Sequence, residues 1–290
     1  MSTKVTLAQF IADEHERIWQ DSTTKHKVET EVKLDRFTAF AGYGSRTLDT
    51  FKPKDIHRFQ DHLLAVGLCK STVNRYSSAI SRVFKHAVDN EIIDKAPSFK
   101  WLKVPRSGRP KHFTDEEIKL IRKYFRGHRH SWMEHFFVLS LNTGMRRGEI
   151  LMINEKDKAG NSLAFVDQDA NGRWWVHLMK TKNGDERDVP LNDEAVEALK
   201  ALEWRPSKYF MHRKFYNGLN DLREEVFDGD PSVVFHVCRA TALTNMAERG
   251  INPYMMSKFV GHRDIQTTLR YVKGKHSALA KIADELMDDV

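Results

Sequence analysis

The chain has 290 residues, enough for one large or two modest domains with buried cores. Its net charge of +7 fits a polyanionic partner if the excess of positive charge lies on one face, because the 47 basic residues are offset by 40 acidic ones. The alternative is a soluble protein that is merely basic. The two cysteines, Cys69 and Cys238, exclude a disulfide framework. No stretch approaches the roughly 18 apolar residues of a membrane span and no signal-peptide core follows Met1, so we expect a cytoplasmic protein without a membrane partner.

Residues 1–95 predict a small domain of four helices, because apolar residues recur at helical spacing in four stretches. These stretches contain Leu7, Phe10, Ile11, Ile18 and Trp19; Val28, Val32 and Phe37; Ile56, Phe59, Leu63 and Leu64; and Val73, Tyr76, Ile80, Val83, Phe84 and Ala87. Lys52-Pro53-Lys54 and Val66-Gly67-Leu68 supply breaks, and Ser71 or Thr72 can cap the last helix.

The start of that last helix is polar and is a candidate for phosphate contacts. The residues concerned are Lys70, Ser71, Thr72, Asn74 and Arg75. An ordinary capped and solvated helix start is the alternative interpretation.

Residues 96–112 predict an interdomain linker, since the periodicity lapses and prolines keep the chain extended. Its basic residues can track a nucleic-acid backbone. The candidate contacts are Lys103, Arg106, Arg109 and Lys111.

Residues 113–273 predict a second domain, which opens on the capping box Thr114-Asp115-Glu116-Glu117. Helices are expected near 114–127 and 131–142. Thr143-Gly144 is typical of a helix end, and a new helix is expected to carry Arg146 in its first turn, with Arg147 as a surface charge.

The period then changes over 162–191, which predicts a three-stranded antiparallel sheet with tight turns at Asn171-Gly172 and Asn183-Gly184. Five helices are expected after the sheet, over 193–203, 208–226, 236–249, 253–260 and 264–272. The fold class is therefore mainly α with a small antiparallel β-sheet (α+β).

Three motifs carry chemistry. They are Thr143-Gly144-Met145-Arg146-Arg147-Gly148-Glu149, then His236-Val237-Cys238-Arg239, then Gly261-His262 with Tyr271 nine residues after His262. Arginines offer planar forks of donors to phosphate oxygens. A tyrosine beside them can attack a phosphodiester if a base takes the proton of the phenol, whose ordinary pKa is about 10.

In order and separation, the motifs resemble those of the tyrosine recombinase (phage integrase) family. The resemblance implies an N-terminal four-helix core-binding domain, a C-terminal catalytic domain and the catalytic residues Arg146, His236, Arg239, His262 and Tyr271. One departure is Ala240, where the family commonly has a histidine.

The family also has a catalytic lysine on a β-hairpin turn, ahead of a strand like Arg187-Asp188-Val189-Pro190-Leu191. Lys182 matches by position, and Lys180 is the alternative. The resemblance implies that Tyr271 attacks, His236 accepts its proton and Lys182 protonates the leaving oxygen. The two motif arginines and His262 would hold the phosphate. No metal or other cofactor is expected.

The resemblance further implies double-stranded DNA as the partner, at a specific recombination site. Gly274 and an amphipathic stripe predict a tail helix over 274–290, which we expect to dock into a neighbouring subunit of a homotetramer on DNA. Packing on its own domain is the alternative. An accessory DNA-bending protein or excisionase is a further expected partner.

The expected function is site-specific recombination through a 3′-phosphotyrosyl intermediate. Because the core-binding domain begins almost at Met1, leaving no room for an arm-binding domain, we expect an integrase of a phage or mobile element. The alternatives are a Xer-type chromosome-resolution recombinase, a type IB topoisomerase-like enzyme and a non-catalytic DNA-binding regulator. The intact set of polar residues speaks against the last of these.

Overall fold

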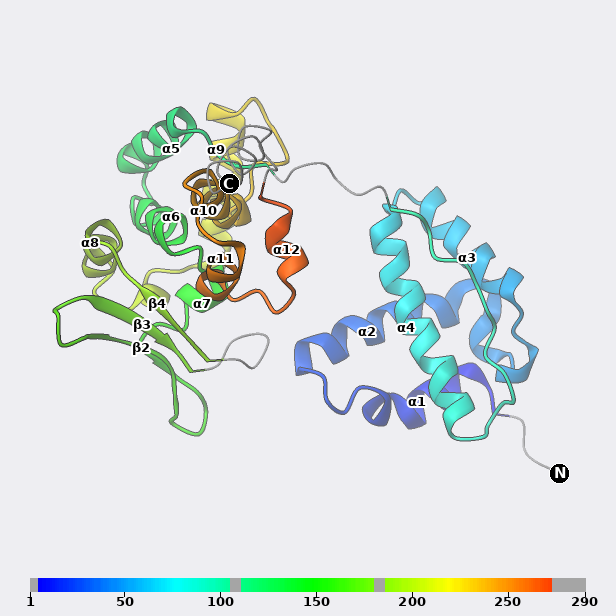
Figure 1. Cartoon of the computed structure of the whole chain (residues 1–290). Helices are drawn as coiled ribbons and strands as arrows, with labels where there is room; N and C mark the ends of the chain where they lie inside the picture. Colours follow the sequence, from blue (N-terminus) through cyan, green and yellow to red (C-terminus); the bar gives the residue numbers. More distant parts are fainter. Residues whose placement is uncertain (1–4, 105–110, 180–185, 273–290) are drawn as a thin grey trace, which may run out of the picture. The chain divides into compact units, whose positions relative to one another are not determined.

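The computed structural model describes residues 5–104, 111–179 and 186–272. The chain divides into two compact units after residue 106, inside the segment expected to be a linker (Figure 1). Within the described residues, no helix is both long enough and apolar enough to cross a membrane.

The first unit is helical in its described part. Its elements are α1 (Leu7–Ile18), α2 (Thr24–Ala39), the 3-10 helices η1 (Phe40–Ser45) and η2 (Leu48–Thr50), α3 (Pro53–Ala65) and α4 (Lys70–Asp89). Thr6 and Thr23 begin α1 and α2 by accepting hydrogen bonds from backbone amides in the first turn. Trp19, Phe37 and Phe59 are buried in its core.

The expected core face of α2 was wrong. Val28 and Val32 are 53% and 60% exposed, whereas Thr30, Leu34 and Phe37 are buried. Nine residues separate Val28 from Phe37, which is two and a half turns of a helix with about 3.6 residues per turn, so the two side chains point in opposite directions.

The start of α4 also differs from expectation. The capping position is occupied by Cys69, and neither Ser71 nor Thr72 caps the helix. Both lie in the first turn, where each hydroxyl is 3.2 Å from the Cys69 sulfur. The helix begins earlier than the first hydroxyl residue, so these side chains are too late in the chain to cap it.

Asn74 is held by the segment that follows the last helix of this unit. Its amide nitrogen donates to the Leu102 carbonyl (2.9 Å), and its amide oxygen accepts from the Leu102 backbone N–H (3.0 Å). Phe99 and Leu102 also pack against the core of the first unit. The first part of the expected linker is therefore fastened to the first unit, and Asn74 has a structural role.

The second unit combines helices with one small sheet. Its described elements are α5 (Asp115–Gly127), α6 (Trp132–Thr143), α7 (Arg147–Ile150), β1 (Glu155–Lys156), β2 (Ser162–Gln168), β3 (Trp174–Leu178), β4 (Arg187–Pro190), α8 (Asp193–Ala201), η3 (Pro206–Lys208), α9 (His212–Val226), α10 (His236–Glu248), α11 (Pro253–Val260) and α12 (Ile265–Leu269). This confirms the expected α+β class.

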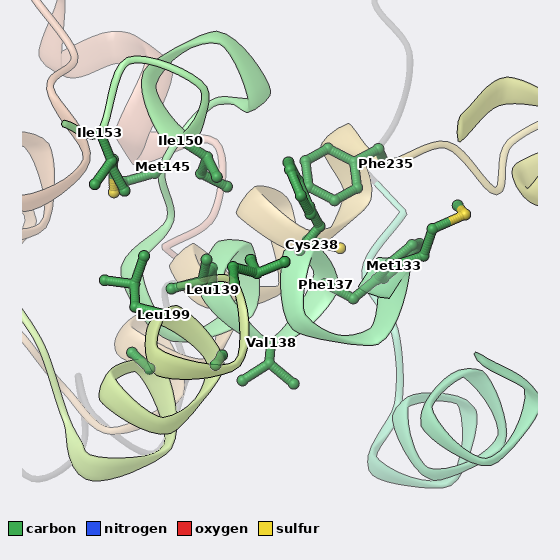
Figure 2. Packing of buried hydrophobic residues seen from close by; sticks show 14 of the residues in the cluster. Met133, Phe137, Val138, Leu139, Met145, Ile150, Ile153, Leu199, Phe235 and Cys238 are labelled. Carbon is green, nitrogen blue, oxygen red and sulfur yellow. The ribbon is translucent and has the colours of Figure 1, made fainter. Parts of the chain in front are cut away.

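Helix α6 is the centre of this unit. It is buried on nearly all sides and packs against α8 and α10, as Figure 1 shows. Figure 2 shows Phe137, Leu139 and Phe235 among the apolar side chains that fill the core around it. The end of α6 leads directly to the first chemical motif, so core packing fixes where that motif begins.

The sheet is antiparallel with the strand order β1-β2-β3-β4. The expected three strands are present, and the two-residue β1 adds a fourth by pairing with β2. A strand of two residues is too short to show an alternating pattern, which is why the sequence did not predict it. The Asn171-Gly172 turn joins β2 to β3, while Asn183-Gly184 lies outside the described residues.

Replacing Phe137 by Ala should destabilise the second unit by about 3–5 kcal/mol, because a fully buried ring would leave a cavity. The measurement is the free energy of unfolding from chemical denaturation of the whole chain. Leu120→Ala on α5 is the control, since Leu120 is 49% exposed and its loss should cost less than about 0.5 kcal/mol. Equal shifts for the two variants would contradict this account of the core.

Candidate active site

Arg146 lies between two helices. Gly144 ends α6 in the left-handed conformation (φ 62°), and Arg146 is the residue immediately before α7, so the expectation that it lies in a first helical turn was wrong. The Arg146 backbone is extended because its N–H donates to Glu149 Oε2 at 2.8 Å. Its guanidinium donates to Glu149 Oε1 at 2.7 Å and to the Gly261 carbonyl at 3.3 Å.

Arg239 projects from the first turn of α10, one turn after His236. Its side chain is almost fully buried, and Nη1 donates to the Gly144 carbonyl at 2.6 Å. The other terminal nitrogen, Nη2, is buried without a hydrogen-bond partner among the described residues. Burial, followed by the nearby charge of Arg146, lowers the pKa of Arg239 to about 9, so it remains charged at neutral pH.

Both motif histidines are neutral at neutral pH. Burial lowers the pKa of His236, and the charges of Arg239 and Arg146 lower it further. The same three causes lower the pKa of His262 to about 4. His236 can therefore accept a proton, and His262 can offer a hydrogen bond without adding to the positive charge.

His262 and Tyr271 belong to one local structure. Gly261 ends α11 in the left-handed conformation (φ 72°) and turns the chain into His262. His262 Nδ1 and the Thr268 hydroxyl are 2.8 Å apart, and the Tyr271 N–H donates to the Thr268 carbonyl at 2.9 Å. With Nδ1 engaged, Nε2 is the ring nitrogen available to a substrate oxygen.

The Tyr271 phenol is 8% exposed and packs in a small apolar cluster that includes Ala240, Leu243 and Val260. The unusual Ala240 thus forms part of the nucleophile's surroundings. Burial raises the pKa of Tyr271, while the charges of Arg270 and Arg239 oppose that rise. The phenol therefore lies within electrostatic range of a motif arginine and still needs a base to become nucleophilic.

Two further residues of the site had no role in the sequence interpretation. The Glu149 carboxylate, 3% exposed, accepts hydrogen bonds from Arg146 and, through both oxygens, from Arg187 at 3.1 and 2.9 Å. Burial alone would raise the pKa of Glu149, but Arg187 and Arg146 lower it overall, so it is ionised. The only sequence signal that could have indicated Glu149 is its place three residues after Arg146. The only signal for Arg187 is its place in the Arg-x-Val-Pro-Leu strand.

The remaining candidates are placed as follows. Lys182, Lys180, Arg106 and Arg109 lie outside the described residues. Lys70, Ser71, Arg75 and Lys103 are exposed on the first unit, and Thr72 is partly exposed. Lys111 forms an ion pair with Asp230 in the second unit.

Arg147 is more than the expected surface charge. It is partly buried, contacts the Tyr216 hydroxyl and lies over the rings of Phe210, Phe215 and Tyr216. Cation–π contacts of this kind anchor an arginine on an aromatic surface. Arg147 therefore fixes the backbone next to Arg146.

The site as a whole carries an excess of positive charge. The guanidinium groups of Arg146, Arg187 and Arg239 carry three positive charges. The Glu149 carboxylate, which is bonded to Arg146 and Arg187, balances one of them, so two remain beside a phenol and two neutral histidines. A buried donor without an acceptor is costly. The arrangement suits an anion with several oxygens. Among the described residues no group of three or more His, Cys, Asp or Glu side chains is placed to hold a metal ion.

Two family models match the chain. Residues 111–277 match the phage integrase family, and residues 6–101 match the phage integrase SAM-like domain. Among curated proteins, the transposase from transposon Tn916 of Enterococcus faecalis is 25% identical over 92% of this chain and 74% of its own length. A tyrosine recombinase XerC-like protein of Caldanaerobacter subterraneus is 26% identical over 78% of this chain and 68% of its own length.

Solved structures share the fold. The Tn1549 transposon integrase in complex with a circular intermediate DNA superposes with a TM-score of 0.74 at 18% identity, covering 97% of this chain and 99% of that chain. A lambda integrase dimer bound to a COC′ core site superposes with a TM-score of 0.71 at 16% identity, covering 94% of this chain and 97% of that one. The family model spans more than half of the chain, so the protein belongs to the phage integrase family, whose members are tyrosine recombinases.

Proposed function

We propose that the protein cuts and rejoins double-stranded DNA at a specific site through a covalent link between Tyr271 and a 3′ phosphate. One observation carries this proposal: the buried Nη2 donor of Arg239 has no acceptor among the described residues. The charge of Arg239 also acts on the Tyr271 phenol, whose pKa it lowers. A scissile phosphate would supply that acceptor and an electrophile for the phenol in one place.

In the proposed step, the Tyr271 oxygen attacks phosphorus and the bond to the 5′ oxygen breaks. His236, neutral in the free protein, accepts the phenol proton. Arg146, Arg239 and His262 bind the non-bridging oxygens, where fixed donors stabilise the charge of the transition state. The phosphodiester's energy is conserved in the bond to tyrosine, so a second DNA end can reverse the step without ATP.

The leaving 5′ oxygen needs a proton. We assign its delivery to Lys182 rather than Lys180, because Lys182 stands at the family's distance from the strand that begins at Arg187. A lysine ammonium close to the scissile phosphate can act as general acid for an alkoxide.

Both units are proposed to contact the DNA. Exposed Lys70, Arg75 and Lys103 of the first unit would bind phosphates, in agreement with the net charge of +7. Recombination joins several DNA ends, so the active assembly is proposed to be a homotetramer linked through the tail at 274–290. A DNA-bending protein or excisionase would set the direction of the reaction.

Within the family, integration of a phage or mobile element is the preferred role. It is supported by relatives named as the Tn916 transposase and the ICEBs1 integrase of Bacillus subtilis. Chromosome resolution is the second candidate, because XerC-type proteins are also relatives. If the protein joins two different sites on separate DNA molecules, integration is favoured. If it resolves tandem copies of one site, chromosome resolution is favoured.

Tyr271→Phe should abolish the covalent protein–DNA adduct and leave DNA binding within about twofold, because only the attacking oxygen is removed. The measurement is an SDS-resistant complex on a nicked duplex carrying the recombination site, beside a gel-shift titration. Tyr254→Phe is the matched control, since Tyr254 is 58% exposed on α11. An adduct in the Tyr271 variant would show that another residue attacks.

Cleavage should persist as the pH is lowered to about 6.5, the ordinary pKa of a histidine, and decline only below it. The required form of His236 is the neutral one, and its pKa is lowered, so the acid limb of the rate profile moves to lower pH. The measurement is the second-order rate constant of adduct formation at protein concentrations below saturation, which reports the pKa of the free protein. His177→Gln, on the sheet and with a raised pKa, should leave this limb unchanged. An acid limb centred above 6.5 would contradict the assignment of His236.

Lys182→Ala should slow cleavage by roughly a hundredfold or more and regain most of the rate on DNA with sulfur in place of the bridging 5′ oxygen. A thiolate leaves without being protonated, so the general acid becomes unnecessary. Lys180→Ala is the control and should cleave both substrates like the unmodified protein. If instead Lys180→Ala shows the sulfur rescue, the general acid is Lys180.

A further inference from the structure

Arg187 is the most enclosed cation of the site after Arg239. Its side chain is 9% exposed, and both terminal nitrogens donate to the two oxygens of Glu149. The same carboxylate accepts from the backbone and the guanidinium of Arg146. Glu149 is therefore shared by the first motif arginine, Arg146, and by Arg187 of β4, which lies 38 residues after Glu149 along the chain.

Arg187 also lies directly against Gly261. A Cβ atom added to Gly261 would clash with Arg187 Nη1 and would make a tight contact with Arg187 Cδ at 3.1 Å. The Gly261 carbonyl accepts from Arg146 at 3.3 Å. Arg187 thus touches both groups that hold the Arg146 guanidinium, which are the Glu149 carboxylate and Gly261. Gly261 is also the residue directly before His262.

Stability alone does not explain this arrangement. Arg187 Nε is buried without a hydrogen-bond partner among the described residues, which is unfavourable. Buried ion pairs are often no more stabilising than apolar residues of similar size. A buried arginine that leaves one donor unpaired points to a role in the reaction.

Charge balance indicates what that role is. If Glu149 had Arg146 as its only partner, the carboxylate would neutralise the guanidinium that must bind the phosphate. With Arg187 present, the charge of Glu149 is already balanced through a two-pronged ion pair. Arg146 then keeps its positive charge while Glu149 still fixes its position.

We propose that Arg187 is a positioning residue that neutralises Glu149 and so keeps Arg146 available to the scissile phosphate. The inference rests on the proposed DNA cleavage. Leu178 and Arg187 face each other across β3 and β4, so Arg187 lies at the last described pair of these two strands.

The test compares two scissile groups. Arg187→Gln should slow formation of the Tyr271 adduct by roughly tenfold to a hundredfold on ordinary DNA, the usual cost of losing a residue that supports a site residue. On DNA with a neutral methylphosphonate at the scissile position, the variant should form the adduct at the same rate as the unmodified protein. The neutral group has one negative charge fewer than a phosphate, so the site needs one positive charge fewer. Arg173→Gln, at the exposed turn of the same sheet, is the control and should behave like the unmodified protein on both substrates.

A second variant removes the carboxylate charge as well. Arg187→Gln combined with Glu149→Gln should cleave ordinary DNA faster than Arg187→Gln alone, since no carboxylate remains to neutralise Arg146. If Arg187→Gln does not fold, as judged by its thermal melting, Arg187→Lys is assayed on the same two substrates and should show a smaller loss confined to ordinary DNA.

Two results would overturn the inference: an unchanged rate on ordinary DNA, or an equal loss on both substrates, which is the signature of a merely structural role. Failure of the proposed function is distinguishable, because the unmodified protein would then form no adduct on either DNA.

Discussion

The site depends on one buried carboxylate shared between two arginines. Glu149 holds Arg146 through its backbone and side chain and receives Arg187 through both oxygens. Because the carboxylate is 3% exposed, these interactions act in a medium of low effective dielectric constant and are strong. The charge of Glu149 joins the segment after α6 to strand β4, and the Arg146 guanidinium that it holds donates to the Gly261 carbonyl at the end of α11. Burial, together with the excess positive charge that remains, keeps both histidines neutral.

Two glycines, Gly144 and Gly261, also position the arginines of the site. Gly144 and Gly261 end α6 and α11 in the left-handed conformation, which a residue with a Cβ rarely adopts. Each places its carbonyl on an arginine, Gly144 on Arg239 and Gly261 on Arg146. Both also lack room for a side chain, since a Cβ at Gly144 would lie 2.8 Å from a Val260 carbon. The glycine that ends each helix therefore also positions an arginine, which explains why a glycine stands shortly before Arg146 and directly before His262 in the two motifs.

The sequence predicted most of this because its signals are local. Helical spacing, capping residues and tight turns indicated the principal elements, and the motif resemblance indicated Arg146, His236, Arg239, His262 and Tyr271. The error over α2 was one of local spacing, because Val28 was placed in the core although it lies half a turn from Phe37. Other features depend on partners distant in the sequence, such as the hydrogen bonds between Asn74 and Leu102. The pairing of Glu149 with Arg187 is likewise a tertiary contact that no local pattern encodes.

The contact between His262 and Thr268 links the imidazole that we propose to bind the phosphate to the segment that carries Tyr271, the proposed nucleophile. Thr268 lies in α12 and its carbonyl accepts from the Tyr271 amide, so any withdrawal of the tyrosine together with α12 also leaves the imidazole without its orienting hydroxyl. Under the proposed function, a protein molecule whose Tyr271 is withdrawn would lose an oriented ligand for the phosphate at the same moment. Such a link between Tyr271 and His262 would disfavour attack of water on the phosphate. Attack by water would break the DNA strand without any means of resealing it.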